Sequence, residues 1–169
     1  KNIDTLINAY SLLINPSYEL LIIGDPITLD DFQYEKELKD LISKSRNSKN
    51  IKMKIAVSRN ELKEIFNESF LHVNLTRNGS FDKANLEAMA CGTISVSSNQ
   101  DFKKIYENYS DECSFKFRDS TSLYKKIKHL QELEQDNFKK ISTLLKQNTI
   151  KYNSLNTIGE RINDQFQKI

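Results

Sequence analysis

The residues best suited to chemistry lie within 79–92, where a hydroxyl and a cation stand at the start of a short predicted helix. Asn78-Gly79 is a turn dipeptide, Ser80 or Asp82 can cap the helix, and a glycine closes it at the far end. The first backbone N–H groups of a helix lack partners and lie at the positive end of its dipole. Together with Ser80 and Lys83, they predict a point that attracts phosphate.

Glu87 lies one helical turn after Lys83, at the edge of an apolar stripe formed by Leu86, Met89 and Ala90. It is too far from the helix start to serve as a capping carboxylate. The residues alone leave two interpretations open. Glu87 is either a ligand-binding carboxylate or half of an exposed ion pair with Lys83, worth roughly 0.2–0.5 kcal/mol in this order along the helix.

The segment 87–93, Glu-Ala-Met-Ala-Cys-Gly-Thr, resembles the C-terminal half of the signature in retaining family 4 glycosyltransferases with the GT-B fold, relatives of sucrose and glycogen synthases. The resemblance implies that Glu87 hydrogen-bonds the ribose hydroxyls of a nucleotide-sugar donor. The family signature begins with another glutamate eight residues earlier, in Glu-Gly-Phe-Gly. Here Gly79-Ser80-Phe81-Asp82 stands in its place, which removes a side chain that contacts the donor sugar. Asp82 and Lys83 are the candidates to replace it.

The stretch that begins at Lys1 resembles the family's segment whose lysine contacts the donor diphosphate, although Lys1 by itself is simply an N-terminal lysine. Lys1 and Lys83 are therefore the predicted catalytic cations. The family frames the nucleotide base with the end of a strand and a leucine of the next helix, and core packing is an equal interpretation for that leucine. The donor-binding residues implied by the resemblance are Gly24, Ala56, Val57, Leu62, Ser80, Phe81, Asp82, Ala84 and Glu87.

The rest of the chain alternates between strand and helix patterns. An apolar run over 19–24 ends at Gly24-Asp25 and predicts a strand buried on both faces, whereas 51–57 alternates apolar residues with lysine and predicts an edge strand. Further strands are predicted over 70–75, 93–98 and 114–117. Helices are predicted over 2–14, 30–45, 58–67, 82–91 and 102–108, with three more within 122–169, broken near 135–136 and 153–154.

Two positions within these elements have structural interpretations. Ser58 and Glu61 have the spacing of a capping box at the start of the helix over 58–67. His72, in the strand over 70–75, is predicted to be a core histidine with satisfied hydrogen bonds rather than a base.

Alternating strands and helices specify a doubly wound α/β fold with a Rossmann-like parallel sheet flanked by helices, in which ligands bind at the carboxyl ends of the strands. Gly24-Asp25, Val57-Ser58 and the loop over 76–83 all fall at that edge. The resemblance makes 1–169 a single donor-binding domain, the C-terminal half of a GT-B fold, with 122–169 as a helical extension.

The first strand of this fold is expected to be missing from the sequence. In the order 3-2-1-4-5-6 it lies between the strands over 19–24 and 70–75, and Lys1 begins the helix that follows it. We therefore expect these two strands to lie about 9–10 Å apart, with no direct ladder between them. The family also has an arginine five residues before this lysine, outside the sequence.

Composition narrows the choice of function. The chain has 169 residues, 38% hydrophobic and 28% charged, and a formal net charge of +2 that does not favour nucleic acid as a partner. It lacks a run of about 18 apolar residues of the kind that spans a membrane. Two cysteines suggest reduced thiols, and two histidines give no metal-ligand spacing. These features predict a cytoplasmic protein, and the resemblance implies neither a metal nor another cofactor.

The predicted function is a glycosyltransferase domain that binds a nucleoside-diphosphate sugar for transfer with retention. Its acceptor, a glycan, lipid or protein, would bind a separate N-terminal domain, and the full-length protein would be cytoplasmic or associated with the cytoplasmic membrane face. A receiver domain is disfavoured because the acidic cluster is missing. With four glycines, neither the dinucleotide nor the P-loop fingerprint can be written. A non-catalytic nucleotide-sugar-binding module is the alternative.

Overall fold

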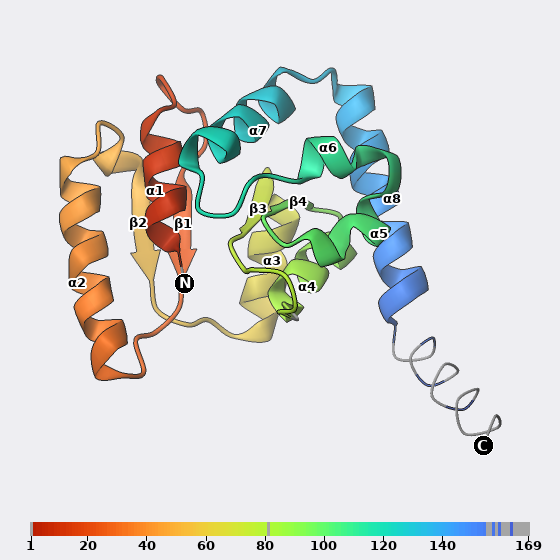
Figure 1. Cartoon of the computed structure of the whole chain (residues 1–169), viewed down its shortest axis with the longest axis horizontal. Helices are drawn as coiled ribbons and strands as arrows, with labels where there is room; N and C mark the ends of the chain where they lie inside the picture. The colour runs from red at the N-terminus through yellow and green to blue at the C-terminus, as the bar shows by residue number, and fades with distance from the viewer. Residues whose placement is uncertain (1, 81, 155–156, 158, 160–162, 164–169) are drawn as a thin grey trace.

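The computed structural model describes residues 2–80, 82–154, 157, 159 and 163 of the chain. Short parallel strands alternate with helices, as the sequence predicts (Figure 1). In chain order the elements are α1 (Ile3–Ser11), β1 (Leu20–Ile23), α2 (Leu29–Lys44), a 3₁₀ turn (Ser48–Asn50), β2 (Ile51–Lys54), α3 (Arg59–Glu68), β3 (Leu71–Asn74), α4 (Lys83–Cys91), β4 (Ile94–Ser97), a 3₁₀ turn (Gln100–Phe102), α5 (Lys103–Tyr106), a 3₁₀ turn (Glu107–Tyr109), α6 (Ser110–Cys113), α7 (Ser120–Glu132) and α8 (Gln135–Asn153).

The strands form two parallel pairs. β1 pairs with β2, Leu20 opposite Ile51, and β3 pairs with β4, Leu71 opposite Ile94. Within the described chain no ladder joins β1 to β3, so the expectation that these strands do not pair directly is confirmed. The predicted separation of about 9–10 Å stays a prediction.

Helices enclose one continuous apolar core around the strands. α1 contacts α2 and α7, while α4 contacts α3 and α8, which runs along the far side of the molecule from β1 and β2 (Figure 1). The segment after 120 therefore packs against the strand-bearing part of the chain through both of its helices. Core residues with little or no exposed surface include Ile7, Leu38, Met89, Ile94, Val96, Tyr106, Leu123, Leu130, Ile141 and Leu145.

The expectation that β1 is buried on both faces is wrong. Leu21 is 39% exposed and lies in register with Lys52 of β2, whose side chain also reaches solvent. Leu20 and Ile22, on the other face, pack against the core. One face of this strand pair is therefore solvated. The alternating lysines predicted such a face for β2, but not for β1.

The predicted strand over 114–117 is also wrong. Ser114 forms an isolated parallel bridge with Ser97, and the backbone then turns, since Asp119 N–H donates to the carbonyl of Lys116 at 3.1 Å. Arg118 within this turn has a φ of 58°, in the left-handed region. Ladder pairing therefore ends after one residue, and Asp119 becomes the N-cap of α7 through a bond to Ser122 N–H.

The capping box expected at Ser58 is half formed. Ser58 Oγ accepts from Glu61 N–H at 3.3 Å, but the Glu61 carboxylate pairs instead with Lys54 Nζ at 2.5 Å. A complete capping box occurs at the start of α2, between Thr28 and Asp31. The last of the three helices predicted in 122–169 falls mostly on residues outside the described part of the chain.

Candidate functional site

Helix α4 begins and ends as its sequence dictates. Asp82 is the N-cap and accepts from Asn85 N–H at 3.1 Å, and Gly92 ends the helix with a left-handed φ of 94°. The helix has nine residues and starts directly after the loop that follows β3. The positive end of its dipole and its unpaired N–H groups therefore point toward that loop. Ser80 lies before the cap and Ala84 in the first turn, both half-buried.

Lys83 and Glu87 form the ion pair that the plainer interpretation predicted. Lys83 Nζ lies 3.5 Å from Glu87 Oε1, and the side chains are 63% and 41% exposed. Such an exposed pair contributes little to stability. Both heads therefore remain accessible to a ligand that approaches the start of α4.

Asp82 is the N-cap of α4, one of the two caps that the sequence allowed, and its predicted contact with the donor sugar stays a prediction. One carboxylate oxygen accepts from Asn85 N–H, and the other accepts from Asn74 Nδ2 at 2.5 Å. The carboxylate is thus turned toward β3 and acts as a helix cap. Of the two candidates to replace the missing signature glutamate, Lys83 is the one with an exposed head group.

A second set of bonds holds the loop over 76–80 against the segment that follows β4. Asn99, with no exposed surface, donates from Nδ2 to the carbonyl of Ser80 at 2.8 Å. Asp101 Oδ2 accepts from Gly79 N–H at 2.6 Å, and Asn78 Oδ1 accepts from Gln100 N–H at 2.8 Å. The loop is therefore fixed before any ligand arrives, and the N–H of Gly79 is already occupied.

His72 belongs to the buried polar layer beneath this loop, as a core histidine should. Its Nδ1 lies 3.0 Å from Ser95 Oγ, which also donates to Asn85 Oδ1, and its ring meets Phe66 edge-on at 5.6 Å. Loss of hydration lowers the pKa of His72 below its usual 6.5, although the nearby Asp82 charge opposes that shift. The imidazole is therefore harder to protonate in the folded chain than in the unfolded chain.

The carboxyl ends of β1 and β2 bring a second group of predicted residues together. Gly24 N–H donates to the carbonyl of Lys54 at 3.0 Å, and Asp25 Oδ1 accepts from Ala56 N–H at 3.1 Å. Gly24 adopts a φ of 153°, which residues with side chains rarely adopt. Val57 and Leu62 follow, both half-buried, with Leu62 in the first turn of α3. In the described chain no hydrogen bond links this group to the start of α4.

Arg118 is a candidate cation that sequence reasoning missed. Its Nε donates to Asn2 Oδ1 at 2.8 Å, and Asn2 Nδ2 donates to the carbonyl of Leu75 at 3.3 Å. The start of α1, the end of β3 and this exposed guanidinium therefore meet at one point. Among the described residues no carboxylate pairs with Arg118. Its place directly after a predicted strand was the signal, because such loops gather at the carboxyl edge of a parallel sheet.

Lys1 and Phe81, two predicted site residues, lie outside the described part of the chain. The contact between Asn2 and Leu75 nevertheless places the beginning of α1 beside the loop that leads to α4. The site is thus built from the N-terminal ends of two helices and the carboxyl end of β3.

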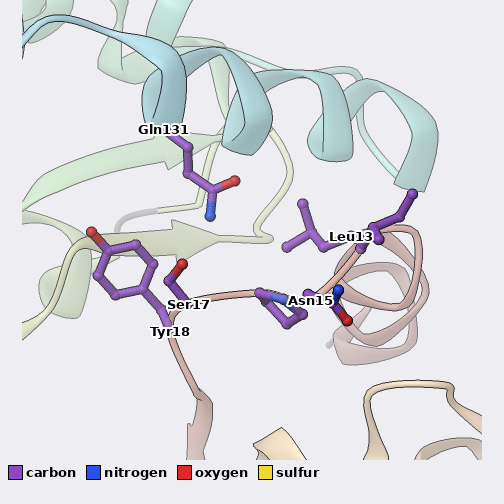
Figure 2. A pocket seen from close by; sticks show the side chains of 7 residues that line it. Leu13, Asn15, Ser17, Tyr18 and Gln131 are labelled. Atoms are coloured by element: carbon purple, nitrogen blue, oxygen red, sulfur yellow. The ribbon is translucent and has the colours of Figure 1, made fainter.

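A cavity of about 290 Å³ lies elsewhere, before the amino end of β1. Figure 2 shows Gln131 of α7 reaching toward Ser17 and Tyr18, with Leu13 and Asn15 on the other side. Its lining includes none of the predicted site residues. In parallel strands this edge is opposite the one where ligands bind.

The described residues contain no group of three or more histidine, cysteine or acidic side chains that could hold a metal ion. None of their helices is long and apolar enough to cross a membrane.

The sequence of the chain matches a known protein family. The sequence model of the family described as glycosyl transferases group 1 matches residues 1–151. The chain belongs to this family. The match includes every site residue predicted from the sequence.

Solved structures share the fold. The chain superposes on the catalytic domain of cholesterol-α-glucosyltransferase from Helicobacter pylori with a TM-score of 0.70 and 18% identity, over 90% of this chain and 91% of the other. It superposes on the Anabaena protein HepE, solved with UDP and glucose, with a TM-score of 0.85 and 17% identity. That alignment covers 98% of this chain but 44% of HepE, so this glycosyltransferase domain spans less than half of that protein. No match to a curated protein reached significance. The α/β fold, with parallel strands flanked by helices, is that of the C-terminal domain of a GT-B glycosyltransferase.

Proposed function

We propose that this domain binds the donor of a retaining family 4 glycosyltransferase of the hexosyltransferase type. The donor is a nucleoside-diphosphate sugar, and the acceptor is a glycan, lipid or protein held by a separate domain. Family membership combined with the Glu-Ala-Met-Ala-Cys-Gly segment on α4, at the carboxyl end of β3, supports the proposal. HepE was solved with UDP and glucose, which makes UDP the first nucleotide to test.

The proposed roles follow from charge and position. Glu87 accepts hydrogen bonds from the ribose hydroxyls, and Ser80 and the N–H groups at the start of α4 face the diphosphate. Lys83, Lys1 and Arg118 supply positive charge as the diphosphate departs, which is the form of electrostatic catalysis that a charged leaving group requires. The base lies beside Gly24, Ala56, Val57 and Leu62. In this scheme neither a metal nor a protein nucleophile takes part, and the parent enzyme works in the cytoplasm or at the cytoplasmic membrane face.

The test is calorimetric titration of the chain with UDP, GDP and ADP. We expect one of the three to bind, and Lys83→Gln to weaken it by about tenfold, as the loss of one charge-assisted contact predicts. Lys128→Gln is the matched control, because Lys128 forms a similar helical pair with Glu132 on α7. The proposal fails if none of the nucleotides binds, or if the two variants lose affinity equally.

A non-catalytic nucleotide-sugar-binding module is the second candidate. It is favoured by Gly79, which stands where the family signature has a glutamate and whose N–H is already bound to Asp101. Turnover by the intact parent protein, measured as release of UDP from UDP-glucose in the presence of an acceptor extract, decides between the two. Nucleotide binding without any turnover supports the non-catalytic module.

A further inference from the structure

We infer that Asn74 is a positioning residue for the nucleotide site. It holds Asp82, the cap of α4, in the orientation that keeps the helix start open to an anion. The role of Asn74 in the loop rests on geometry alone, and its effect on nucleotide affinity rests on the proposed function.

The Asn74 side chain ties three segments together. It is 2% exposed and donates from Nδ2 to Asp82 Oδ2 at 2.5 Å. Its Oδ1 accepts from Thr76 Oγ1 at 2.8 Å, from Thr76 N–H at 3.4 Å and from Ser97 Oγ at 2.7 Å. The amide of Asn74, at the end of β3, thus joins the end of β4 to Asp82, the N-cap of α4. A buried polar group with bonds to three segments in this way favours a single local arrangement.

The charge of Asp82 explains why this orientation matters. A carboxylate at a helix N-terminus is favourable for the helix dipole, but it repels an anionic ligand at the same place. Asn74 and the N–H of Asn85 each bind one of its oxygens, so the carboxylate faces the protein interior. Without the amide donor, Asp82 keeps only the bond from Asn85 N–H, and its second oxygen is released toward the diphosphate.

Asparagine is the side chain that this position requires. It presents a donor to Asp82 and an acceptor to Thr76 and Ser97 on opposite sides of one planar group. Aspartate has the same shape but presents oxygen to all three. Asn74→Asp therefore places two carboxylates within hydrogen-bond distance, and this raises the pH at which the pair takes up a proton.

The experiment measures UDP affinity of Asn74→Asp at about pH 8 and about pH 5.5, with the unsubstituted chain alongside. The titratable groups facing this point are Asp82, His72 of β3 and Tyr106 of α5, whose hydroxyl lies by Asn85, Ser95 and Ser97. We expect at least tenfold weaker binding at the higher pH and partial recovery at the lower, where a shared proton restores a donor toward Asp82. Amide hydrogen exchange in 76–85 should be faster than in the unsubstituted chain at the higher pH.

Asn148→Asp is the matched control. Asn148 is 8% exposed and its Nδ2 donates to the carbonyl of Ile105 at 3.0 Å, between α8 and α5. The substitution Asn148→Asp makes the same chemical change as Asn74→Asp at a buried amide away from the loop. It should therefore lower the stability of the chain and leave its UDP affinity unchanged.

Three results would overturn or redirect the inference. It is wrong if Asn74→Asp keeps both the original UDP affinity and the original exchange rates at the higher pH. It is also wrong if Asn148→Asp loses as much affinity as Asn74→Asp. If the unsubstituted chain does not bind UDP at all, the proposed function fails, and the exchange rates in 76–85 then decide by themselves whether Asn74 positions the loop.

Discussion

Two ion pairs of this chain have nearly the same geometry and different surroundings. Lys83 and Glu87 lie 3.5 Å apart on α4, and Lys128 and Glu132 lie 3.6 Å apart on α7, in the same order along the helix. Exposed pairs of this kind each contribute at most about 1 kcal/mol to stability. Any difference between them in nucleotide binding must therefore come from their positions.

Glu87→Gln should weaken UDP binding by about tenfold, because a neutral amide replaces the charge-assisted bonds to the ribose. The melting temperature should stay nearly unchanged. Titration calorimetry and thermal unfolding of the variant, with Glu132→Gln beside it, provide the measurements. A large drop in melting temperature with unchanged affinity would show that Glu87 has a structural role only.

Arg118 allows a second prediction at this scale. Arg118→Gln removes a guanidinium that is held beside the start of α1 by Asn2. We expect weaker UDP binding and a weaker dependence of the affinity on salt, since one cation fewer faces the diphosphate. Lys116→Gln, in the same turn, is the control and should change neither quantity. Equal effects of the two substitutions would mean that only the general charge of this surface matters.

At the scale of elements, hydrophobic pattern predicted most of the fold. It placed the four strands of the described chain and the main helices around them, because alternation and apolar runs follow from the burial of strand and helix faces. It did not predict that β4 is buried on both faces, so that one buried face of the β3–β4 pair is polar. His72 pairs with Ser95 and Asn74 with Ser97 in the β3–β4 register. Both strands alternate apolar and polar residues, so the signal was present, but only the register shows that the polar positions meet.

The same limit explains the failed strand over 114–117. Its alternating aromatic residues fit a strand, but the left-handed Arg118 and the turn before α7 depend on where Asn2 and Asp119 lie. The bond between Arg118 and Asn2 joins residues 116 positions apart. Local sequence does not encode it.

The polar layer under α4 predicts a pH dependence of stability. The pKa of His72 is lowered in the folded chain, so the unfolded chain binds the proton more readily. Its contribution to stability is complete above about pH 6.5 and is lost as the pH falls below that value toward the folded pKa. His72→Asn should therefore flatten the fall in unfolding free energy between about pH 7 and pH 5.

Urea unfolding of the unsubstituted chain and of His72→Asn at several pH values measures this effect. His129→Asn is the control, because it removes the exposed imidazole of α7 and leaves the polar layer intact. If His72→Asn keeps the full pH dependence, carboxylates rather than His72 are responsible for it.

At the scale of the whole molecule, the chain spans less than half of HepE. Under the proposed function, acceptor binding belongs to a separate domain. We therefore expect the 169 residues alone to bind UDP and to transfer no sugar to any acceptor. Incubation with radiolabelled UDP-glucose and a cell extract tests this. Labelled product formed by the isolated chain would refute the assignment of the acceptor site to another domain.

The two strand pairs lead to the last prediction. In the described chain β1 hydrogen-bonds only to β2, and β3 only to β4, so each has one edge without a ladder partner. In a parallel strand, alternate N–H groups point to opposite edges. Amide exchange along Leu20–Ile23 and Leu71–Asn74 should therefore alternate, with slow amides in the existing ladders and fast amides on the two facing edges.

A peptide that forms a parallel strand between β1 and β3 should slow the fast set and leave the slow set as it was. A buried backbone N–H or C=O group without a partner costs about 1–3 kcal/mol. The added strand would give such groups partners, so it should also raise the melting temperature. Uniformly slow exchange in the chain by itself would contradict this prediction, since it would mean that the facing edges are already paired in solution. The proposed place of Lys1 beside the diphosphate would then have to be revised.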